Sequence, residues 1–525
     1  MFVLNVTIQS LYIQEVQLGL ICKNGVYKYV VFLDRGGELM RKLFLKIICM
    51  FILMGGISLV ILGCFFTPTV DINILATTDL HGVIQTDMVS YINNYKEKNP
   101  DTVVVDAGDF IGGEFGTSGD TLKYYDLMHS DDKDNNYNYV SKKHIEIPLA
   151  REMKDAGFDT VTLGNHEFIE NNKTSLDNMI SDFEKQGISV LSANTYNRNG
   201  ESYTKPYDIK EIKTPQGTVN VGILGLTIKE VGENKEWVDD KLVKTKSLEL
   251  KDQKGYNGEL YMNDLVEDAN KWIKVMKEKE HADVIIAVAH TGEKPKKPKN
   301  PGNRIQDLAQ NVSGIDAIVA GHNHVQIKQH DYKNKDGKNV IVTEPGKHGE
   351  CISKIDIKLK KDINGWDVIS KSSDIVQFEN AKKNLDMLCN NHGMFYCETS
   401  VLLESRKEGK VISLKDVIPF KWDKMYIFKP GTPRDEIYKK VGYKFLNITE
   451  SDDMYQFIIM DKDKVVCYSD AIKNNIPTLL KVDDSYFDNN YITIVPGKND
   501  YFKIVKEEKE KYGDRYKTIL EYKQK

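Results

Sequence analysis

Short apolar runs alternate with helix-like periodicity between Asp71 and Asp374. The apolar runs are typical of buried strands, and they are Ile72–Ala76, Thr102–Val105, Val284–Ala289 and Ile315–Ala320. Between two of them, Tyr261–Glu280 places its apolar residues on one face at helical spacing, which predicts an amphipathic helix. Because strands and helices alternate, we expect an α/β domain over residues 64–375.

The pattern weakens after this region. Residues 376–399 are predicted to be a linker, and residues 400–525 a smaller α+β unit of unknown role. In that unit, Met425–Phe428 and Tyr455–Met460 are strand-like, and the charged stretch Val505–Lys511 is expected to be a helix.

Two stretches of the α/β region read as surface segments. Thr117–Lys143 is acidic and rich in Asn, which favours an insertion at the surface. Glu293–Gly302 is a loop rich in Pro and Lys.

An export signal is predicted at residues 40–63. Three basic residues open this segment, the apolar run Ile47–Leu62 follows, and Gly63 precedes Cys64. This order is typical of a bacterial lipoprotein signal peptide, with Cys64 as the lipid anchor to the cell membrane. A plain membrane-anchoring helix is the alternative, and both place the following chain outside the cytoplasm. Signal peptides begin at the N-terminus, so we expect residues 1–39 to be a mis-assigned start extension and Met40 the true start.

Composition and net charge indicate which kinds of partner and of scaffold are disfavoured for this chain. The 525 residues are 41% hydrophobic and 28% charged, as in ordinary globular proteins, with net charge −5. Residues 1–63 hold six basic and three acidic residues, so the other 462 carry 66 basic and 74 acidic residues, net −8. This balance argues against a nucleic-acid polymer as partner. Seven Cys are too few for a disulfide scaffold; Cys389 and Cys397 are expected to be free thiols, with a disulfide as the alternative.

Five motifs with metal-ligand residues follow predicted strands. They are TTDLHG with Asp79 and His81, DAGD with Asp106 and Asp109, GNHE with Asn165, His166 and Glu167, AHTGE with His290, and AGHNH with His322 and His324. Imidazole and carboxylate groups suit divalent metals such as zinc, manganese and iron. Any one motif is more often a turn than a metal site. Five at strand ends together predict a site where two metals promote phosphoester hydrolysis.

The order and flanking residues of these motifs resemble the calcineurin-like metallophosphoesterases. Stretches such as ILATTDLHG, GFDTVTLGNHEF and GIDAIVAGHNH resemble the branch of 5′-nucleotidases, UDP-sugar hydrolases and 2′,3′-cyclic-nucleotide phosphodiesterases. The resemblance covers roughly Asp71 to Lys360, and it implies a four-layer α/β/β/α sandwich with metals at the strand ends.

The resemblance also implies residue roles. One metal would be held by Asp79, His81, Asp109 and His324, and the other by Asp109, Asn165, His290 and His322. Asp109 would bridge two divalent ions (Mn, Zn or Fe), and His166 would be the catalytic histidine beside Asn165. Asp106 is expected to be structural.

Three features bear on the substrate and on the catalytic histidine. Nucleotidases of this branch pair the catalytic histidine with an Asp, where this chain has Ile169, so Glu170 either replaces that partner or nothing does. His348, in EPGKHGE, either contacts substrate or is a turn residue. The nucleobase-binding stretch of the branch has no match after Lys360.

These observations predict an extracytoplasmic, lipid-anchored phosphoester hydrolase acting on nucleotides, of the 5′-nucleotidase type, with a role in nucleotide catabolism. A 2′,3′-cyclic-nucleotide phosphodiesterase and a UDP-sugar hydrolase are the alternatives within this chemistry. A non-catalytic metal- or nucleotide-binding lipoprotein is the alternative outside it. A cytoplasmic protein phosphatase or a DNA nuclease is disfavoured by the export signal.

Overall fold

The computed structural model describes most of the chain. The described residues are 3–6, 16–23, 26–33, 68–112, 118, 120–121, 124–125, 146–238, 241–294, 302–378, 381–452, 454–472, 480–508 and 516–523. The predicted signal peptide, Cys64, most of the acidic insertion and most of the Pro/Lys loop lie outside these ranges. No helix within the described ranges has the length and apolar character needed to cross a membrane.

The chain divides into two units, Met1–Thr69 and Val70–Lys525. In the first unit, three antiparallel strands form one small sheet in the order β1-β2-β3. These strands are β1 (Val3–Val6), β2 (Val16–Lys23) and β3 (Val26–Leu33).

The second unit begins with a six-stranded sheet in the order β19-β18-β4-β5-β6-β7, whose last four strands are parallel. Its strands are β4 (Thr69–Thr77), β5 (Val103–Asp106), β6 (Thr160–Thr162), β7 (Ser189–Leu191), β18 (Cys351–Asp362) and β19 (Gly365–Gln377).

A second six-stranded sheet has the order β16-β17-β15-β14-β10-β9, with four parallel central strands and antiparallel edges. Its strands are β9 (Tyr207–Thr214), β10 (Gly217–Thr227), β14 (Val284–His290), β15 (Ala317–Ala320), β16 (Gln326–Lys333) and β17 (Asn339–Pro345).

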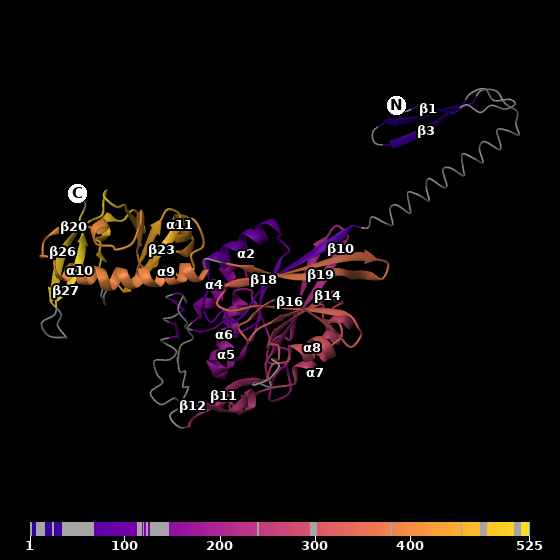
Figure 1. Ribbon diagram of the computed structural model, residues 1–525, viewed down its shortest axis with the longest axis horizontal. Coiled ribbons are helices and arrows are strands. Elements are labelled where there is room, and N and C mark those ends of the chain that lie inside the picture. Colours follow the sequence, from indigo (N-terminus) through magenta and orange to yellow (C-terminus); the bar gives the residue numbers. More distant parts are fainter. Residues whose placement is uncertain are drawn as a thin grey trace. The chain divides into compact units, whose positions relative to one another are not determined.

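Helices cover the outer faces of the two sheets, while the inner faces pack against each other (Figure 1). Val104 of β5 joins the core under the helices, and its neighbour Val105 joins the core between the sheets. Ile285 and Ile286 of β14 divide in the same way. The helices are α2 (Thr86–Lys98), α4 (Pro148–Ala156) and α6 (Lys173–Lys185) on the first sheet, and α7 (Leu265–Glu278) and α8 (Ile305–Asn311) on the second. The expected four-layer α/β/β/α sandwich is therefore confirmed.

Shorter elements connect these layers. They are α5 (Asn165–Ile169), the paired strands β8 (Thr195–Asn197) and β13 (Leu260–Met262), the hairpin β11 (Glu230–Val238) and β12 (Lys241–Glu249), and the 3-10 turns η1 (Leu250–Asp252) and η2 (Lys254–Tyr256).

Residues 381–525 are called the C-terminal unit below. Their described part forms two four-stranded sheets, in the orders β20-β26-β27-β24 and β23-β22-β21-β25. The strands are β20 (Val411–Ser413), β21 (Lys424–Phe428), β22 (Met454–Asp461), β23 (Lys464–Ile472), β24 (Leu480–Lys481), β25 (Tyr491–Ile494), β26 (Tyr501–Glu508) and β27 (Tyr516–Tyr522). The helices are α9 (Ala381–Gly393), η3 (Met394–Glu398), α10 (Thr399–Glu404), η4 (Leu414–Asp416), α11 (Arg434–Val441) and η5 (Asp484–Tyr486).

The helix expected at Val505–Lys511 is wrong, because β26 continues to Glu508 and pairs with β27. At the start of β26, the fully buried Phe502 and Ile504 lie on either side of the charged Lys503, which is the period of two typical of a strand. The segment predicted as a linker, 376–399, contains α9, whose Asn391 donates a 2.8 Å hydrogen bond to the carbonyl of Val466. The domain boundaries themselves stay predictions.

Candidate metal centre

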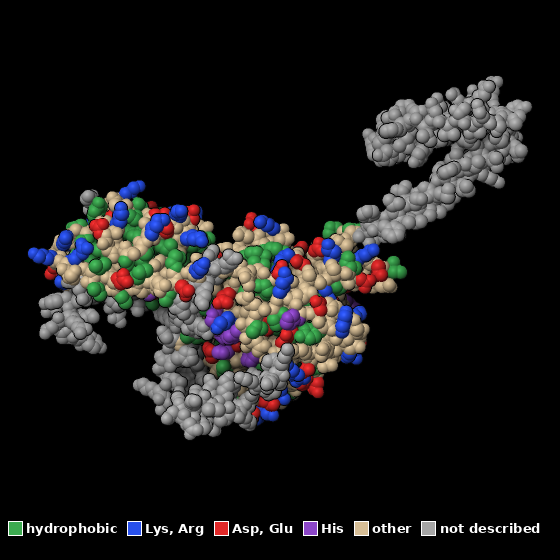
Figure 2. All heavy atoms as spheres, in the orientation of Figure 1, with side chains coloured by type: hydrophobic (Ala, Val, Ile, Leu, Met, Phe, Trp, Pro, Cys, Tyr) green, Lys and Arg blue, Asp and Glu red, His purple; other side chains and the backbone are tan. Residues whose placement is uncertain are grey.

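The predicted ligand residues come from five strand ends that meet at one edge of the sandwich. Asp79 and His81 follow β4, and Asp109 follows β5. Asn165 begins α5 after β6, and the other three residues end β14 or follow β15; these are His290, His322 and His324. Carboxyl ends of parallel strands lie at the same edge, so residues distant in sequence meet there. Figure 2 shows histidine side chains gathered in one area of the visible face.

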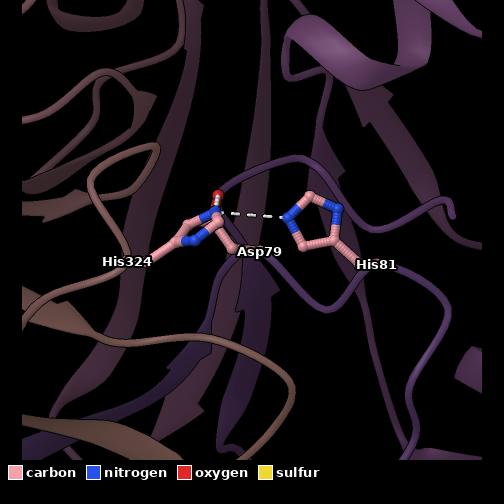
Figure 3. A group of neighbouring side chains, drawn as sticks. All are labelled: Asp79, His81 and His324. Atoms are coloured by element: carbon pink, nitrogen blue, oxygen red, sulfur yellow. Dashed lines mark hydrogen bonds and ion pairs between the residues drawn. The ribbon is translucent and has the colours of Figure 1, made fainter. Parts of the chain in front are cut away.

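One group of ligand atoms is formed by Asp79, His81 and His324. Nε2 of His81 and Nε2 of His324 lie 3.2 Å apart, and the latter lies 3.2 Å from Oδ1 of Asp79. Figure 3 shows the two rings pointing a nitrogen toward each other beside this carboxylate. Three donor atoms therefore converge on one point.

A second group is formed by Asp109, His290 and His322, and Asp109 also groups with His81 and His166. Nε2 of His290 lies 3.1 Å from Oδ2 of Asp109. Oδ1 of Asn165 lies 3.1 Å from Nε2 of His290 and 2.8 Å from Nδ1 of His322. Asp109 thus lies between the two groups, where a bridging carboxylate would have to be.

The backbone of the centre is strained. Ten non-glycine residues have positive φ within the described ranges. Five of them lie in these strand-end loops, namely Asp79, His81, Asp109, His322 and His324, and a sixth, His348, follows β17. Such conformations are unfavourable for residues with a Cβ and are concentrated at functional sites. Gly164 permits the close packing, because a Cβ there would lie 2.3 Å from Oδ1 of Asp109.

The donor set fits divalent metal ions. Oδ2 of Asp79 accepts hydrogen bonds from Thr78 and the backbone of His322. No donor in the described part of the chain hydrogen-bonds to its buried Oδ1, which faces His324. A metal ion coordinated by this oxygen and by the imidazole nitrogen would compensate the burial of the unpaired oxygen.

The protonation of the rings bears on this fit. Burial lowers the pKa of His81, although Asp109 opposes the effect. Burial and the neighbouring His290 lower the pKa of His322 to about 4. Both rings are therefore neutral at pH 7, the form that binds metals. At His290 burial also lowers the pKa, but the Asp109 carboxylate reverses this and raises it to about 10, so a metal must displace a proton there.

Nδ1 of His166 lies 2.7 Å from Oε1 of Glu170, four residues later at the end of α5. Burial alone would lower the pKa of His166, but the hydrogen bond to Glu170 and the charge of Asp109 raise it to about 9. Ile169, the position where the resembling branch carries Asp, is thus not the position that reaches the ring. The His166 side chain is 33% exposed, so solvent and small molecules can reach it.

His348 lies at the edge of the centre. Its ring centroid is 5.7 Å from that of His81, and its backbone N–H donates a 2.9 Å hydrogen bond to the carbonyl of Asp79. Nε2 of Gln85 donates to the carbonyl of His348, which fixes the loop from the other side.

Comparisons with known proteins bear on this geometry. The family model described as calcineurin-like phosphoesterase matches residues 72–326. These residues form a calcineurin-like phosphoesterase domain. Phosphoesterases are hydrolases, so the domain belongs to a class of enzymes.

Curated relatives match more than half of this chain. The chain is 31% identical over 342 residues to the trifunctional nucleotide phosphoesterase protein YfkN of Bacillus subtilis, covering 59% of this chain and 21% of that protein. It is 24% identical to a 2′,3′-cyclic-nucleotide 2′-phosphodiesterase/3′-nucleotidase of Salmonella typhimurium, covering 57% of this chain and 45% of that protein. A crystal structure of YfkN from Bacillus subtilis aligns with a TM-score of 0.45 and 29% identity over 59% of this chain and 91% of that one. The chain thus spans less than half the length of these two curated relatives.

One important residue of the phosphoesterase domain received no role from the sequence. Glu167 is fully buried and accepts hydrogen bonds from the backbone of Asp109, Ile111 and Gly164. Burial and the Asp109 carboxylate raise its pKa to about 8. Its place in GNHE is the only sequence signal, because two of the three amides it binds, those of Asp109 and Ile111, come from another loop. Asp106, expected to be structural, accepts from Thr77 and from the backbone of Gly108.

Proposed function

We propose that the chain is an extracytoplasmic phosphoester hydrolase that depends on two divalent metal ions and acts on nucleotides, of the 5′-nucleotidase type. The observation that carries this proposal is the position of Asp109 between two groups of imidazole and carboxylate donors. A phosphoesterase domain that places a carboxylate there has the arrangement needed for two adjacent metals.

We infer the ligands of the two ions from these groups. Asp79, His81, Asp109 and His324 would hold one ion. Asp109, Asn165, His290 and His322 would hold the other. Two bound ions would activate water as the nucleophile and stabilise the charge on the attacking and leaving oxygens. The carbonyl of Ala107 lies 2.8 Å from Nδ1 of His290, which orients the ring with Nε2 toward the centre.

His166 would act on the phosphoryl group or on the leaving oxygen. Glu170 accepts the hydrogen from Nδ1, so Nε2 of His166 is left for substrate. The raised pKa of His166 favours the protonated ring, which can donate a hydrogen bond or a proton to a phosphate oxygen. His348 is near enough to the His81 side of the centre to contact a bound substrate.

A second candidate is hydrolysis of 2′,3′-cyclic nucleotides. The relatives named for this activity match 57% of the chain, whereas those named 5′-nucleotidase from Vibrio vulnificus and Vibrio cholerae match 33%. UDP-sugar hydrolysis and metal or nucleotide binding without catalysis remain further outcomes of the same test.

The location outside the cytoplasm rests on the sequence of residues 40–64 alone. Expression in a bacterial host should give a chain that starts at a lipid-modified Cys64 and is recovered with membranes. Cys64→Ala should prevent the modification. Wild-type protein recovered unmodified in the cytoplasm would contradict the proposed location.

The substrate proposal is tested by a panel of 5′-nucleotides, 2′,3′-cyclic nucleotides and UDP-sugars with added Mn²⁺. We expect phosphate release from 5′-nucleotides, and none after metal removal by a chelator. Asp109→Asn serves as the inactive control. Hydrolysis of the cyclic nucleotides alone would favour the second candidate. Binding of two ions without hydrolysis of any compound would establish a binding protein.

A further inference from the structure

Asp120 joins the phosphoesterase domain to the C-terminal unit. Its Oδ1 accepts a hydrogen bond from Oγ1 of Thr449, and its Oδ2 accepts a 3.0 Å hydrogen bond from the backbone N–H of Glu450. Nη2 of Arg434 lies 3.5 Å from the same Oδ2, and the Arg434 side chain is only 3% exposed. Asp120, Arg434, Thr449 and Glu450 are called the Asp120 cluster below. They form a largely buried ionic contact, and removing one partner of such a contact destabilises the fold strongly.

The residues around Asp120 are also tied to α4. Oγ of Ser118 and Oγ1 of Thr121 both donate to Oε1 of Glu152, which is fully buried. Nη2 of Arg434 lies 3.7 Å from this same oxygen. Ser118, Asp120 and Thr121 therefore contact α4 on one side or the C-terminal unit on the other.

Tyr125, five positions after Asp120 in the chain, contacts the loop beside the metal centre. Its hydroxyl accepts a 2.9 Å hydrogen bond from the backbone N–H of Gly112. Gly112 lies so near the ligand loop that a Cβ there would be 3.0 Å from Cα of His81. Burial raises the pKa of Tyr125 well above its usual value, and the charge of Glu170 adds to this, so Tyr125 lies within electrostatic reach of the proposed partner of His166.

The apolar packing agrees with a fixed contact. Met153 of α4 and Ile437 and Phe445 of the C-terminal unit belong to one continuous buried core. Lys444 adds a 2.7 Å hydrogen bond to the carbonyl of Asp155 at the end of α4.

We propose that the C-terminal unit positions one wall of the metal centre, with Asp120 and Arg434 as positioning residues that act through Tyr125 and Gly112. The inference rests on the proposed function for its kinetic consequence, but the contact itself can be measured without turnover. It gives residues 400–525 a role other than binding a nucleobase.

The test compares Asp120→Asn, Thr449→Val and Thr449→Ser with the wild type in the full chain. Asp461→Asn is the matched control, because Asp461 pairs with Lys421 on the exposed surface of the same unit. The first readout is amide hydrogen exchange in peptides that span Asp109–Gly112. The second is kcat and KM for the best nucleotide of the panel, with bound metal measured alongside.

Asp120→Asn and Thr449→Val should exchange about tenfold faster over Asp109–Gly112, the effect expected on losing a hydrogen bond to a charged group. KM should rise while bound metal stays at the wild-type level. Thr449→Ser keeps the hydroxyl, so its exchange rate over Asp109–Gly112 and its KM should equal those of the wild type. Asp461→Asn should also leave the exchange rate and KM unchanged. Exchange over Asp109–Gly112 equal to wild type in both variants would overturn the inference. If the wild type hydrolyses nothing, the proposed function fails, and the exchange data alone decide whether the contact positions the wall.

Discussion

Nδ1 of His166 in α5 and Oε1 of Glu170, the residue that caps the end of this helix, lie 2.7 Å apart. A carboxylate at this distance fixes both the tautomer and the orientation of an imidazole. Residues four apart lie on the same face of a helix, so the side chain of Glu170 can reach the ring of His166. Ile169, three positions after His166, occupies the place where the resembling branch carries Asp.

Glu170→Gln should lower kcat by roughly 10²-fold, because the amide cannot stabilise a protonated His166 as a carboxylate does. Steady-state kinetics with a 5′-nucleotide checks this, and bound metal should stay unchanged. Glu184→Gln on α6 is a suitable control, since Glu184 pairs only loosely with Lys205 at the surface. Wild-type kcat in Glu170→Gln would mean that Glu170 does not assist His166.

Asp109→Asn should lower turnover by at least about 10³-fold, more than the loss of a typical single electrostatic contact. It should also release metal, because an amide is a weaker ligand than a carboxylate. Asp106→Asn offers a comparison: Asp106 is equally buried but bonds Thr77 and Gly108 rather than the ligand groups. Metal analysis of the two purified variants separates them. Full metal content and activity in Asp109→Asn would exclude a bridging role.

Glu167→Ala should destabilise the protein by about 3 kcal/mol or more, because three buried backbone N–H groups lose their acceptor. Glu167→Gln retains one oxygen acceptor and should cost less. Urea unfolding at pH 7 measures both free energies of unfolding. A loss below about 1 kcal/mol in the alanine variant would show that these loops hold their conformation without Glu167.

The stability of the protein should depend on pH through Glu152. Burial raises its pKa from 4.5 to about 7, although Arg434 opposes the effect. The folded state therefore binds more protons than the unfolded state between these values, so the contribution of Glu152 to stability falls as pH rises from about 4.5 to 7. Glu152→Gln lacks this dependence, while Arg434 and Asp120 are present in both proteins. Urea unfolding at pH 5 and pH 8 should show the wild type losing stability relative to the variant, and a constant difference would contradict this assignment.

Much of the candidate site could be predicted from sequence because each motif carries both its ligand and its strand. Asp79 and Asp109 each follow an apolar run that predicts a parallel strand. The carboxyl ends of parallel strands lie at one edge of the sheet, so the sequence alone predicts that these two residues are close in space. The choice of Glu170 as partner of His166 needed the helix geometry. The contact of Asp120 with Arg434 spans 314 positions in the chain, and no local pattern predicts such a pair.

The wrong expectation of a helix in the C-terminal unit also comes from contacts between distant parts of the chain. Val505–Lys511 is dense in charge and was expected to be a helix, but the buried partners of β26 lie on β20 and β27, which the local sequence does not reveal. Tertiary contacts decide such segments, since charge density alone is compatible with a helix or with an exposed strand face.

The most direct measurement is the release of phosphate from a 5′-nucleotide by the full chain, first stripped of metal and then titrated with Mn²⁺ while bound ions are counted. We predict no release without metal and a rise in activity that is complete at two bound ions per chain. Undiminished hydrolysis in the metal-free protein, or full activity with a single ion, would contradict the dinuclear site around Asp109.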